Sequence, residues 1–587
     1  MPRKGEWQAM TNVALYVPEK EVSAWVTETD PKDARAWLAS LPLADAGESA
    51  RDIYQALYTL NRLALVPHTR LELMELYREP VSTVSSVLQH QFGGLAMPLP
   101  FELRQMAEFI RQLQMEMAIG YKCAIQDLGA TRISWGRKNQ LVLASERAMV
   151  YLGQALLRSY QVYMPQPTGV WTEIHTLFRY AEEQEYLGQS VETSESAGDN
   201  PTILRRYQQI LLLGLCSPYQ LPQNECNHVN AFLEEWADKA VIGDQLGVTD
   251  PAGHFLINLS LDAPPVPLVQ HRATARSAPE LRVLNTLEVA RAVHDLSKRL
   301  DDGEPAKALG FSEELSDASV REMLRRMIKF WGLTPQRRFA RTQTRGHLSV
   351  CTGINALHFF GSGGKPFAPP VHPPPESQAP AGKPAQVAKP PNDPRAKPAR
   401  GPAATPRPGL PKWLAETKLP TPESYPVDRW RLQDESARGL LLLREGEMLG
   451  QLRVGDVLGM QSGGDLGNWH VGVIRWIKSP QPRRVEMGVE RLAPKVSPVA
   501  LRVSPSVGRS TPYVQGLLLP AMPVLQRPAA LLAPRGLYEA GRALEMVLGN
   551  GPSRMLRPIK LLERTATFDL IVFVDIFVDT RSRNSVS

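Results

Sequence analysis

The sequence predicts a multidomain α + β protein: a mainly α-helical N-terminal region, then a small antiparallel β-barrel and a C-terminal β-rich segment. Three observations support this prediction. The chain has 587 residues, too many for a single hydrophobic core. Apolar residues recur at helical spacing through the first 240 or so residues. After Pro426 the pattern changes to short alternating runs separated by glycine turns.

The helical pattern is clearest early in the chain. One stripe consists of Leu103, Met106, Ile110, Leu113 and Met117. Similar runs follow at 139–164, 171–185 and 201–215 with short breaks between them. Because short breaks join helices that pack against each other, we expect stacked helical hairpins over residues 1–240.

A mixed connector is expected over residues 241–332. Residues 254–262, HFLINLSLD, indicate a strand, and two further helices follow. The second helix is expected from Ser319, which can form a capping box with Glu322, to Trp331. The stretch after it, RGHLSVCTGINALHFF at 345–360, is predicted to be a strand.

Proline dominates residues 361–425, which hold 18 of the 51 prolines of the chain and almost no aliphatic residues. Such a segment buries too little apolar surface to offset its ordering entropy, so a disordered spacer is expected. A polyproline ligand in PPVHPPP is the alternative. The β pattern on either side predicts a barrel over 333–498 that this segment interrupts, and a β-rich segment over 499–587.

Positive charge is concentrated in two places. Of the net charge of +7, the stretch 361–411 carries +5, so the remainder of the chain is nearly neutral. A broad electrostatic surface for DNA is therefore not expected. The second concentration is PQRRFARTQTR at 335–345, which has four arginines and no acid. This cluster is either a solvated linker or an anion site.

A second motif lies in RLQDESARGLLLL, which contains Asp434-x-Ser436-x-x-Gly439. Taken alone it predicts a turn, in which the Asp and Ser side chains bond local backbone groups and Gly439 takes a positive φ.

Together, Arg337-Arg338-x-x-Arg341 and Asp434-x-Ser436-x-x-Gly439 resemble the two-part signature of PilZ domains, a family of bacterial cyclic di-GMP receptors. The motifs are 93 residues apart, and removing the 65 residues of the proline-rich segment leaves 28, the length of one β-hairpin. The segment therefore looks like an insertion at a hairpin tip, where long loops are tolerated. The later run MGVERL resembles the GVEF-like end of the family, with Arg491 in place of Phe.

The resemblance implies a ligand-binding set of Arg337, Arg338, Arg341, Asp434, Ser436 and Gly439. The arginines would contact phosphates and guanine edges, because a guanidinium binds both bidentately. The aspartate would accept from guanine or hold an arginine, and the serine would donate to phosphate. Arg345 is a second candidate, or else a solvated residue at the start of a strand.

No catalytic or metal motif is found in the sequence, so neither an enzyme nor a cofactor is expected. Gly463-Gly464-Asp465 is interpreted as a hairpin turn. The four cysteines form no disulfide pattern, which indicates thiols in a reducing cytoplasm, and no membrane span is expected.

The favoured function is a cytoplasmic cyclic di-GMP effector whose barrel binds the dinucleotide and whose helical region then changes its interaction with a protein partner. The alternative is a helical scaffold protein whose barrel is structural and binds no nucleotide.

Overall fold

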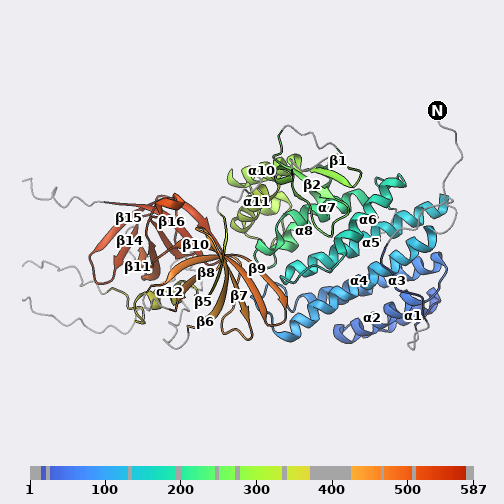
Figure 1. The fold of residues 1–587 in the computed structure, drawn as a ribbon, viewed down its shortest axis with the longest axis horizontal. Helices are drawn as coiled ribbons and strands as arrows, with labels where there is room; N and C mark the ends of the chain where they lie inside the picture. The colour runs from blue at the N-terminus through green and yellow to red at the C-terminus, as the bar shows by residue number, and fades with distance from the viewer. Residues whose placement is uncertain are drawn as a thin grey trace, which may run out of the picture.

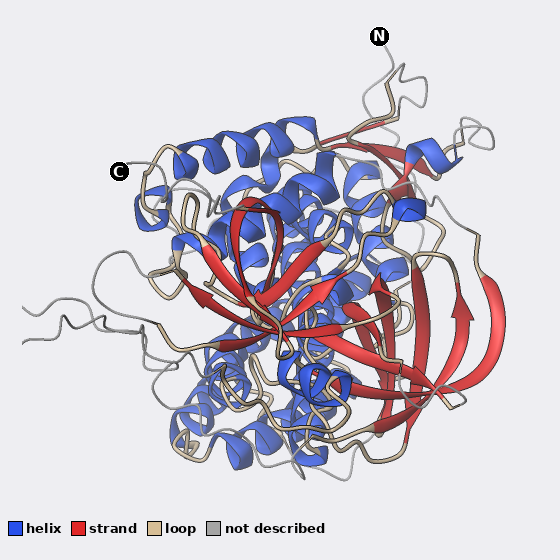
Figure 2. Ribbon diagram, turned by 90° about the vertical axis from the view of Figure 1, so that its left-hand side faces the viewer, coloured by secondary structure: helices blue, strands red, loops and turns tan. Residues whose placement is uncertain are grey.

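The computed structural model describes residues 15–21, 27–129, 135–191, 201–244, 250–271, 278–332, 340–370, 425–463, 468–504 and 511–576. Its parts follow one another along the long axis of the molecule (Figure 1). Helices occupy one end, a first β-barrel the middle and a second β-barrel the other end. In the view along this axis the strands lie in front of the helices (Figure 2).

The helical region is built from successive hairpins around one continuous core. Its longest helices, α4 and α5, pack side by side (Figure 1). Aspartates cap the first two helices: Asp30 accepts from Lys32 N at 2.8 Å and Asp45 from Glu48 N at 3.0 Å. The helices are α1 (Pro31–Ser40), α2 (Ala46–Arg62), α3 (Pro67–Gln89), α4 (Phe101–Gly129), α5 (Trp135–Gln161), α6 (Val170–Glu183), α7 (Ile203–Leu215) and α8 (Glu225–Trp236).

A small mixed part joins these helices to the barrels. Its sheet has the order β1-β4-β2-β3 and includes the predicted strand at 254–258. The capping prediction for the last helix was wrong: Ser316 Oγ accepts from Ser319 N at 3.2 Å, so the helix begins at Asp317. The elements are β1 (Val241–Gly243), β2 (His254–Asn258), β3 (Val266–Pro267), α9 (Leu268–His271), β4 (Leu281–Asn285), α10 (Leu287–Asp301) and α11 (Asp317–Gly332).

The first barrel is closed and antiparallel, with the order β10-β7-β6-β5-β8-β9. The prediction of one strand over 345–360 was wrong in its second half, because Gly353 takes a φ of 91° and ends the strand. A helix follows, whose Ile354 and Leu357 are buried. The elements are β5 (Thr342–Thr352), α12 (Ile354–Gly361), β6 (Asp428–Glu435), β7 (Gly439–Glu445), β8 (Val457–Ser462), β9 (His470–Gln481) and β10 (Arg484–Ala493).

The C-terminal segment forms a second closed antiparallel barrel, with the order β11-β12-β13-β16-β15-β14. Its core is separate from that of the first barrel and includes Leu501, Leu531 and Met546. The strands are β11 (Ser497–Val503), β12 (Val514–Leu519), β13 (Ala530–Pro534), β14 (Leu544–Leu548), β15 (Ser553–Arg564) and β16 (Phe568–Asp575).

Helix α12 helps to join the two barrels. A hydrophobic cluster combines Leu357 of α12, Trp469 and Val471 of the first barrel, and Leu532 and Phe568 of the second barrel. Burial of this apolar surface favours a fixed arrangement of the barrels.

The helical region contacts the first barrel near the hairpin between β9 and β10. Arg104 Nη1 donates to the carbonyl and hydroxyl oxygens of Ser479 at 3.0 and 2.7 Å. Ser479 N in turn donates to Tyr163 O at 2.8 Å. Met97 and Leu452 add a short antiparallel bridge.

The predicted fold class, multidomain α + β with a helical N-terminal region and antiparallel barrels, is confirmed. All four cysteines are free and buried. Within the described ranges, no helix has both the length and the apolar character needed to cross a bilayer. The proline-rich insertion expected at 361–425 lies mostly outside the described residues, which resume at Tyr425.

Candidate ligand-binding site

The two sequence motifs meet at one end of the first barrel. Arg341 immediately precedes β5, and Asp434 lies near the end of β6 opposite Gln343 in the strand register. Arg341 Nη1 contacts both carboxylate oxygens of Asp434, at 2.9 and 3.1 Å. The side chain of Arg341 is 43% exposed and that of Asp434 is 19% exposed. The aspartate therefore holds a solvent-accessible guanidinium at the barrel edge.

Ser436 and Gly439 close the turn between β6 and β7. Ser436 N donates to Gly439 O at 2.8 Å, and Gly439 N donates to Ser436 Oγ at 3.1 Å. The serine hydroxyl also lies 3.3 Å from Gly439 O. The predicted turn with serine bonded to local backbone is present. Asp434 does not follow the turn interpretation, since its carboxylate binds Arg341, which is one of the two roles that the PilZ resemblance implied for it.

The need for glycine at 439 has a different cause from the one predicted. Gly439 does not have a positive φ, so that prediction was wrong. A Cβ at this position would lie 2.7 Å from the carbonyl oxygen of Val489 on β10. Only a residue without a side chain allows the two backbones to approach so closely at the site.

The remaining predicted residues are placed only in part. Arg337 and Arg338 lie outside the described residues. Arg345 is exposed on β5, within a register shift between Gln343 and Gly346. Gly463 lies in a turn after β8, while Gly464 and Asp465 are outside the described residues.

A largely buried acid, the glutamate of the MGVERL run, lies beside the turn, and the sequence analysis assigned it no role. Glu490 of β10 is 12% exposed and accepts bonds from three arginines. Arg438, inside the motif, donates from Nε at 2.9 Å, and Arg475 of β9 donates from Nε at 2.6 Å. The third donor is Arg527 of the second barrel. Burial alone would raise the pKa of Glu490, but these arginines outweigh it and lower the pKa to about 2.

This group of charges, which we call the Glu490 cluster, reaches from the motif to the second barrel. Arg475 pairs with Glu490 and also, through Nη2, with Glu563 of β15 at 2.8 Å. Because its ion pairs outweigh desolvation, the pKa of Arg475 is raised. No local sequence pattern predicts the ion pair between Arg475 and Glu563, because the two residues are 88 positions apart.

Arg491, which replaces the phenylalanine of the family pattern, also has a structural role. Its Nη2 donates to Glu435 Oε2 at 2.7 Å, and its backbone N donates to Arg438 O at 2.8 Å. Glu435 is the residue after Asp434, so Arg491 fixes the outer side of the same turn.

Among the described residues no group of three or more His, Cys, Asp or Glu side chains could hold a metal ion.

A closed antiparallel barrel that carries an arginine motif before its first strand and a D-x-S-x-x-G turn after its second is a PilZ domain by fold and motif. Comparison with known proteins agrees. The family model "Cyclic-di-GMP receptor FimW, N-terminal domain" matches residues 32–245, "middle PilZ domain" matches 254–498, and "FimW C-terminal beta-barrel domain" matches 499–576. No solved structure matches the chain.

A curated relative extends the match across almost the whole chain. The protein is 30% identical over 546 residues to the cyclic-di-GMP receptor FimW of Pseudomonas aeruginosa, which covers 89% of this chain and 86% of the relative. The chain belongs to the FimW family of PilZ-containing proteins, and the predicted PilZ resemblance is confirmed.

Proposed function

We propose that this protein is an effector that binds cyclic di-GMP at the Arg341–Asp434 end of the first barrel. The observation that supports this most is the contact between two motifs 93 residues apart in the chain. The named ligand of the Pseudomonas relative supports it independently. The ligand carries two phosphates and two guanines, and guanidinium groups bind both kinds of group bidentately.

Arg341 is suited to receive such a ligand. Its Nη1 is held by Asp434, while among the described residues its Nε and Nη2 have no hydrogen-bond partner. A phosphate could therefore bind the free edge of the guanidinium without breaking the ion pair. We assign the same role to Arg337 and Arg338, and a hydrogen bond to phosphate to Ser436. Gly439 keeps the turn against β10.

Signal transfer to a protein partner through the helical region is the second half of the proposal. Helix α11 ends at Gly332, and eight residues separate it from Arg341. The end of this helix is anchored, since Trp331 Nε1 donates to Leu212 O at 3.1 Å and Trp331 O accepts from Thr286 Oγ at 2.6 Å. A ligand that repositions the arginines would therefore pull on a fixed helix.

The alternative function, a scaffold whose barrel binds no nucleotide, is compatible with the ion pair, since Arg341 and Asp434 already satisfy part of each other's charge. Calorimetric titration of the full chain with cyclic di-GMP, beside a DNA duplex, separates the two. We expect saturable heat with the dinucleotide alone. Absence of heat with the dinucleotide would favour the scaffold.

Hydrogen exchange tests the transfer step separately from binding. We expect cyclic di-GMP to raise protection around Arg341 and to change exchange in α11 over residues 319–331. Binding by calorimetry with no change in α11 would retain the receptor and reject the proposed route to the helical region.

A further inference from the structure

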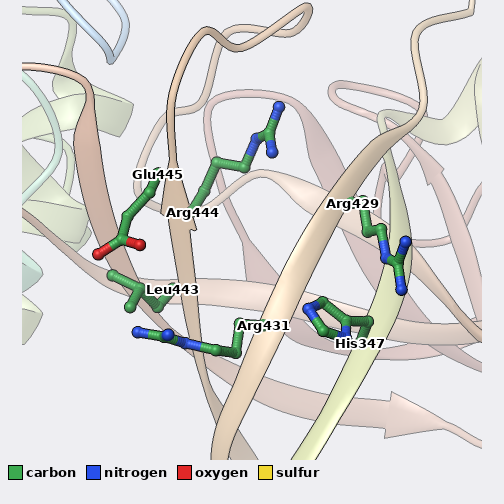
Figure 3. A pocket seen from close by; sticks show the side chains of 6 residues that line it. All are labelled: His347, Arg429, Arg431, Leu443, Arg444 and Glu445. Carbon is green, nitrogen blue, oxygen red and sulfur yellow. The ribbon is translucent and has the colours of Figure 1, made fainter.

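A hollow of about 330 Å³ lies on the outer face of the first barrel (Figure 3). It spans three neighbouring strands, and its lining is strongly cationic. The lining residues are His347 of β5, Arg429 and Arg431 of β6, and Leu443, Arg444 and Glu445 of β7. We call it the β6 hollow.

Strand alternation places the two arginines of β6 on the same outer face. On β6, Trp430 and Leu432 are buried in the barrel core while Arg429 and Arg431 are exposed. Arg431 pairs across the sheet with His347 on one side and Leu443 on the other. Neither cross-strand neighbour gives Arg431 an acidic partner, so no opposite-charge pair across the sheet accounts for its position.

Most of the positive charge in the hollow is not neutralised. Among the described residues, Arg429 and Arg431 form no ion pair and no side-chain hydrogen bond. Arg444 donates to the carbonyl oxygen of Glu447 at 2.7 Å and lies 3.8 Å from Asp428. Glu445 lies 3.5 Å from Arg484, outside the hollow. The two β6 guanidiniums are therefore available to an anion from solvent.

The hollow is separate from the Arg341–Asp434 site. Arg431 and Arg429 precede Asp434 by three and five residues on β6, which corresponds to about 10 and 16 Å along a strand. Arg444 and Glu445 are the last two residues of β7, whereas Gly439 is its first residue. The hollow thus extends away from the motif toward the far end of the barrel.

The lining fits a small phosphate-bearing molecule better than a protein surface. Planar guanidinium groups match phosphate oxygens, and 330 Å³ is within the range of small-molecule sites. A stable protein interface needs about 800 Å² on each partner and apolar anchors, whereas Leu443 is the one aliphatic side chain in this lining. Glu445 can accept from a hydroxyl or amino group of the same ligand.

We propose that the β6 hollow is a second anion site, which takes a soluble, multiply charged phosphate compound that also carries hydroxyl or amino groups. Arg429 and Arg431 bind the phosphates, His347 and Arg444 flank them, and Glu445 receives the hydrogen-bond donor. The site acts independently of dinucleotide binding at Arg341.

The test uses the full chain, with inorganic pyrophosphate as the probe in calorimetric titrations. The test variant is Arg429→Gln/Arg431→Gln. The matched control is Arg554→Gln/Arg557→Gln, which removes the same charge from exposed positions on β15 of the second barrel. We expect pyrophosphate to bind at least about tenfold more weakly to the test variant and unchanged to the control. Cyclic di-GMP affinity should stay within twofold in both.

Several outcomes would overturn the proposal. Pyrophosphate that does not bind the wild-type chain, or binds both variants equally, would make the cluster an ordinary solvated surface. If the folded test variant loses cyclic di-GMP binding together with pyrophosphate binding, the hollow is part of the dinucleotide site. Co-sedimentation with phosphatidylglycerol vesicles is measured as well. If the test variant loses only this co-sedimentation and keeps its affinity for pyrophosphate, the face binds a membrane surface. If the double variant misfolds, Arg431→Gln alone replaces it.

Discussion

The two barrels share an architecture but differ in how they use arginine. Both are closed, antiparallel and six-stranded. In the second barrel Arg502, Arg554 and Arg564 each pair with an acid of the same barrel: Glu545, Asp575 and Asp569, respectively. In the first barrel Arg429 and Arg431 have no acidic partner among the described residues, and Arg341 offers an open edge. The shared fold therefore does not fix where unpaired arginines gather: in the first barrel two of them lie on the same face of β6.

The contact between the barrels shows a third use of arginine. The Glu490 cluster collects Arg438 from the motif, Arg475 from β9 and Arg527 from the second barrel around one carboxylate. The motif turn is thus tied electrostatically to the second barrel, whereas the helical region contacts the first barrel at the other end of β10.

A substitution in the motif turn should cause the greatest loss of stability. Gly439→Ala would place a Cβ 2.7 Å from the backbone oxygen of Val489, which cannot move without disrupting β10. We expect a loss of about 3 kcal/mol in the free energy of unfolding, measured by chemical denaturation. Gly463→Ala, where nothing lies within 4 Å and φ is not positive, is the matched control and should change little. Equal stability of the two variants would show that the turn tolerates a side chain.

Acid should weaken the contact between the barrels through Glu490. Its pKa is lowered from 4.5 to about 2 by its arginines, in excess of the effect of burial. A lowered carboxyl pKa stabilises the fold above about pH 4.5, and this contribution, roughly 3 kcal/mol, is lost as the pH falls toward 2. Glu490→Gln should therefore be less stable near neutral pH and show a shallower loss between pH 4.5 and 2. Parallel pH profiles for the variant and the wild type would contradict the pairing.

Removing one arginine should lower the free energy of unfolding more at the junction between the barrels than on the outer face of the second barrel. Arg475→Gln leaves Glu490, 12% exposed, with fewer partners, and we expect a cost of roughly 2 kcal/mol. Arg554→Gln leaves Asp575, 32% exposed, and should cost less than about 1 kcal/mol. Denaturation of both variants measures the difference. A larger cost at Arg554 would reverse the comparison.

Much of the first barrel could be predicted because its signals are local. The alternating runs at 428–445 and 470–493 became strands, and subtraction of the proline-rich segment placed Arg341 beside Asp434. Residues 354–361 could not be assigned as a helix in the same way. Their largely apolar run suits either structure, and tertiary burial against both barrels decides the outcome.

The second barrel and the Glu490 cluster depend on contacts distant in sequence. Closure of β11 onto both β12 and β14 is a tertiary event with no local sequence signal. In the same way, Arg475 and Glu563 lie on different barrels and each resembles an ordinary surface residue in the sequence. The cause of glycine at 439 was also hidden, since close approach to Val489 becomes visible only once β7 and β10 pair.

The smallest effect is expected from removing the insertion. Deletion of residues 371–420 should leave the stability of the barrel and its cyclic di-GMP affinity within experimental error, because β5 and β6 pair directly on either side of it. Circular dichroism and calorimetry check this. If the protein that lacks residues 371–420 no longer folds, the segment is not an insertion at a hairpin tip.

On the proposed function, Arg341 binds cyclic di-GMP through its guanidinium geometry as well as its charge. Calorimetric titration of the wild type, Arg341→Lys and Arg341→Ala tests it most directly, with Arg557→Lys on the second barrel as the control. One charge-assisted phosphate contact contributes about 1.5–3 kcal/mol, so Arg341→Ala should bind at least about tenfold more weakly. Arg341→Lys should also lose most of the affinity, because the planar fork is gone. Wild-type affinity in folded Arg341→Ala would show that Arg341 does not bind the dinucleotide.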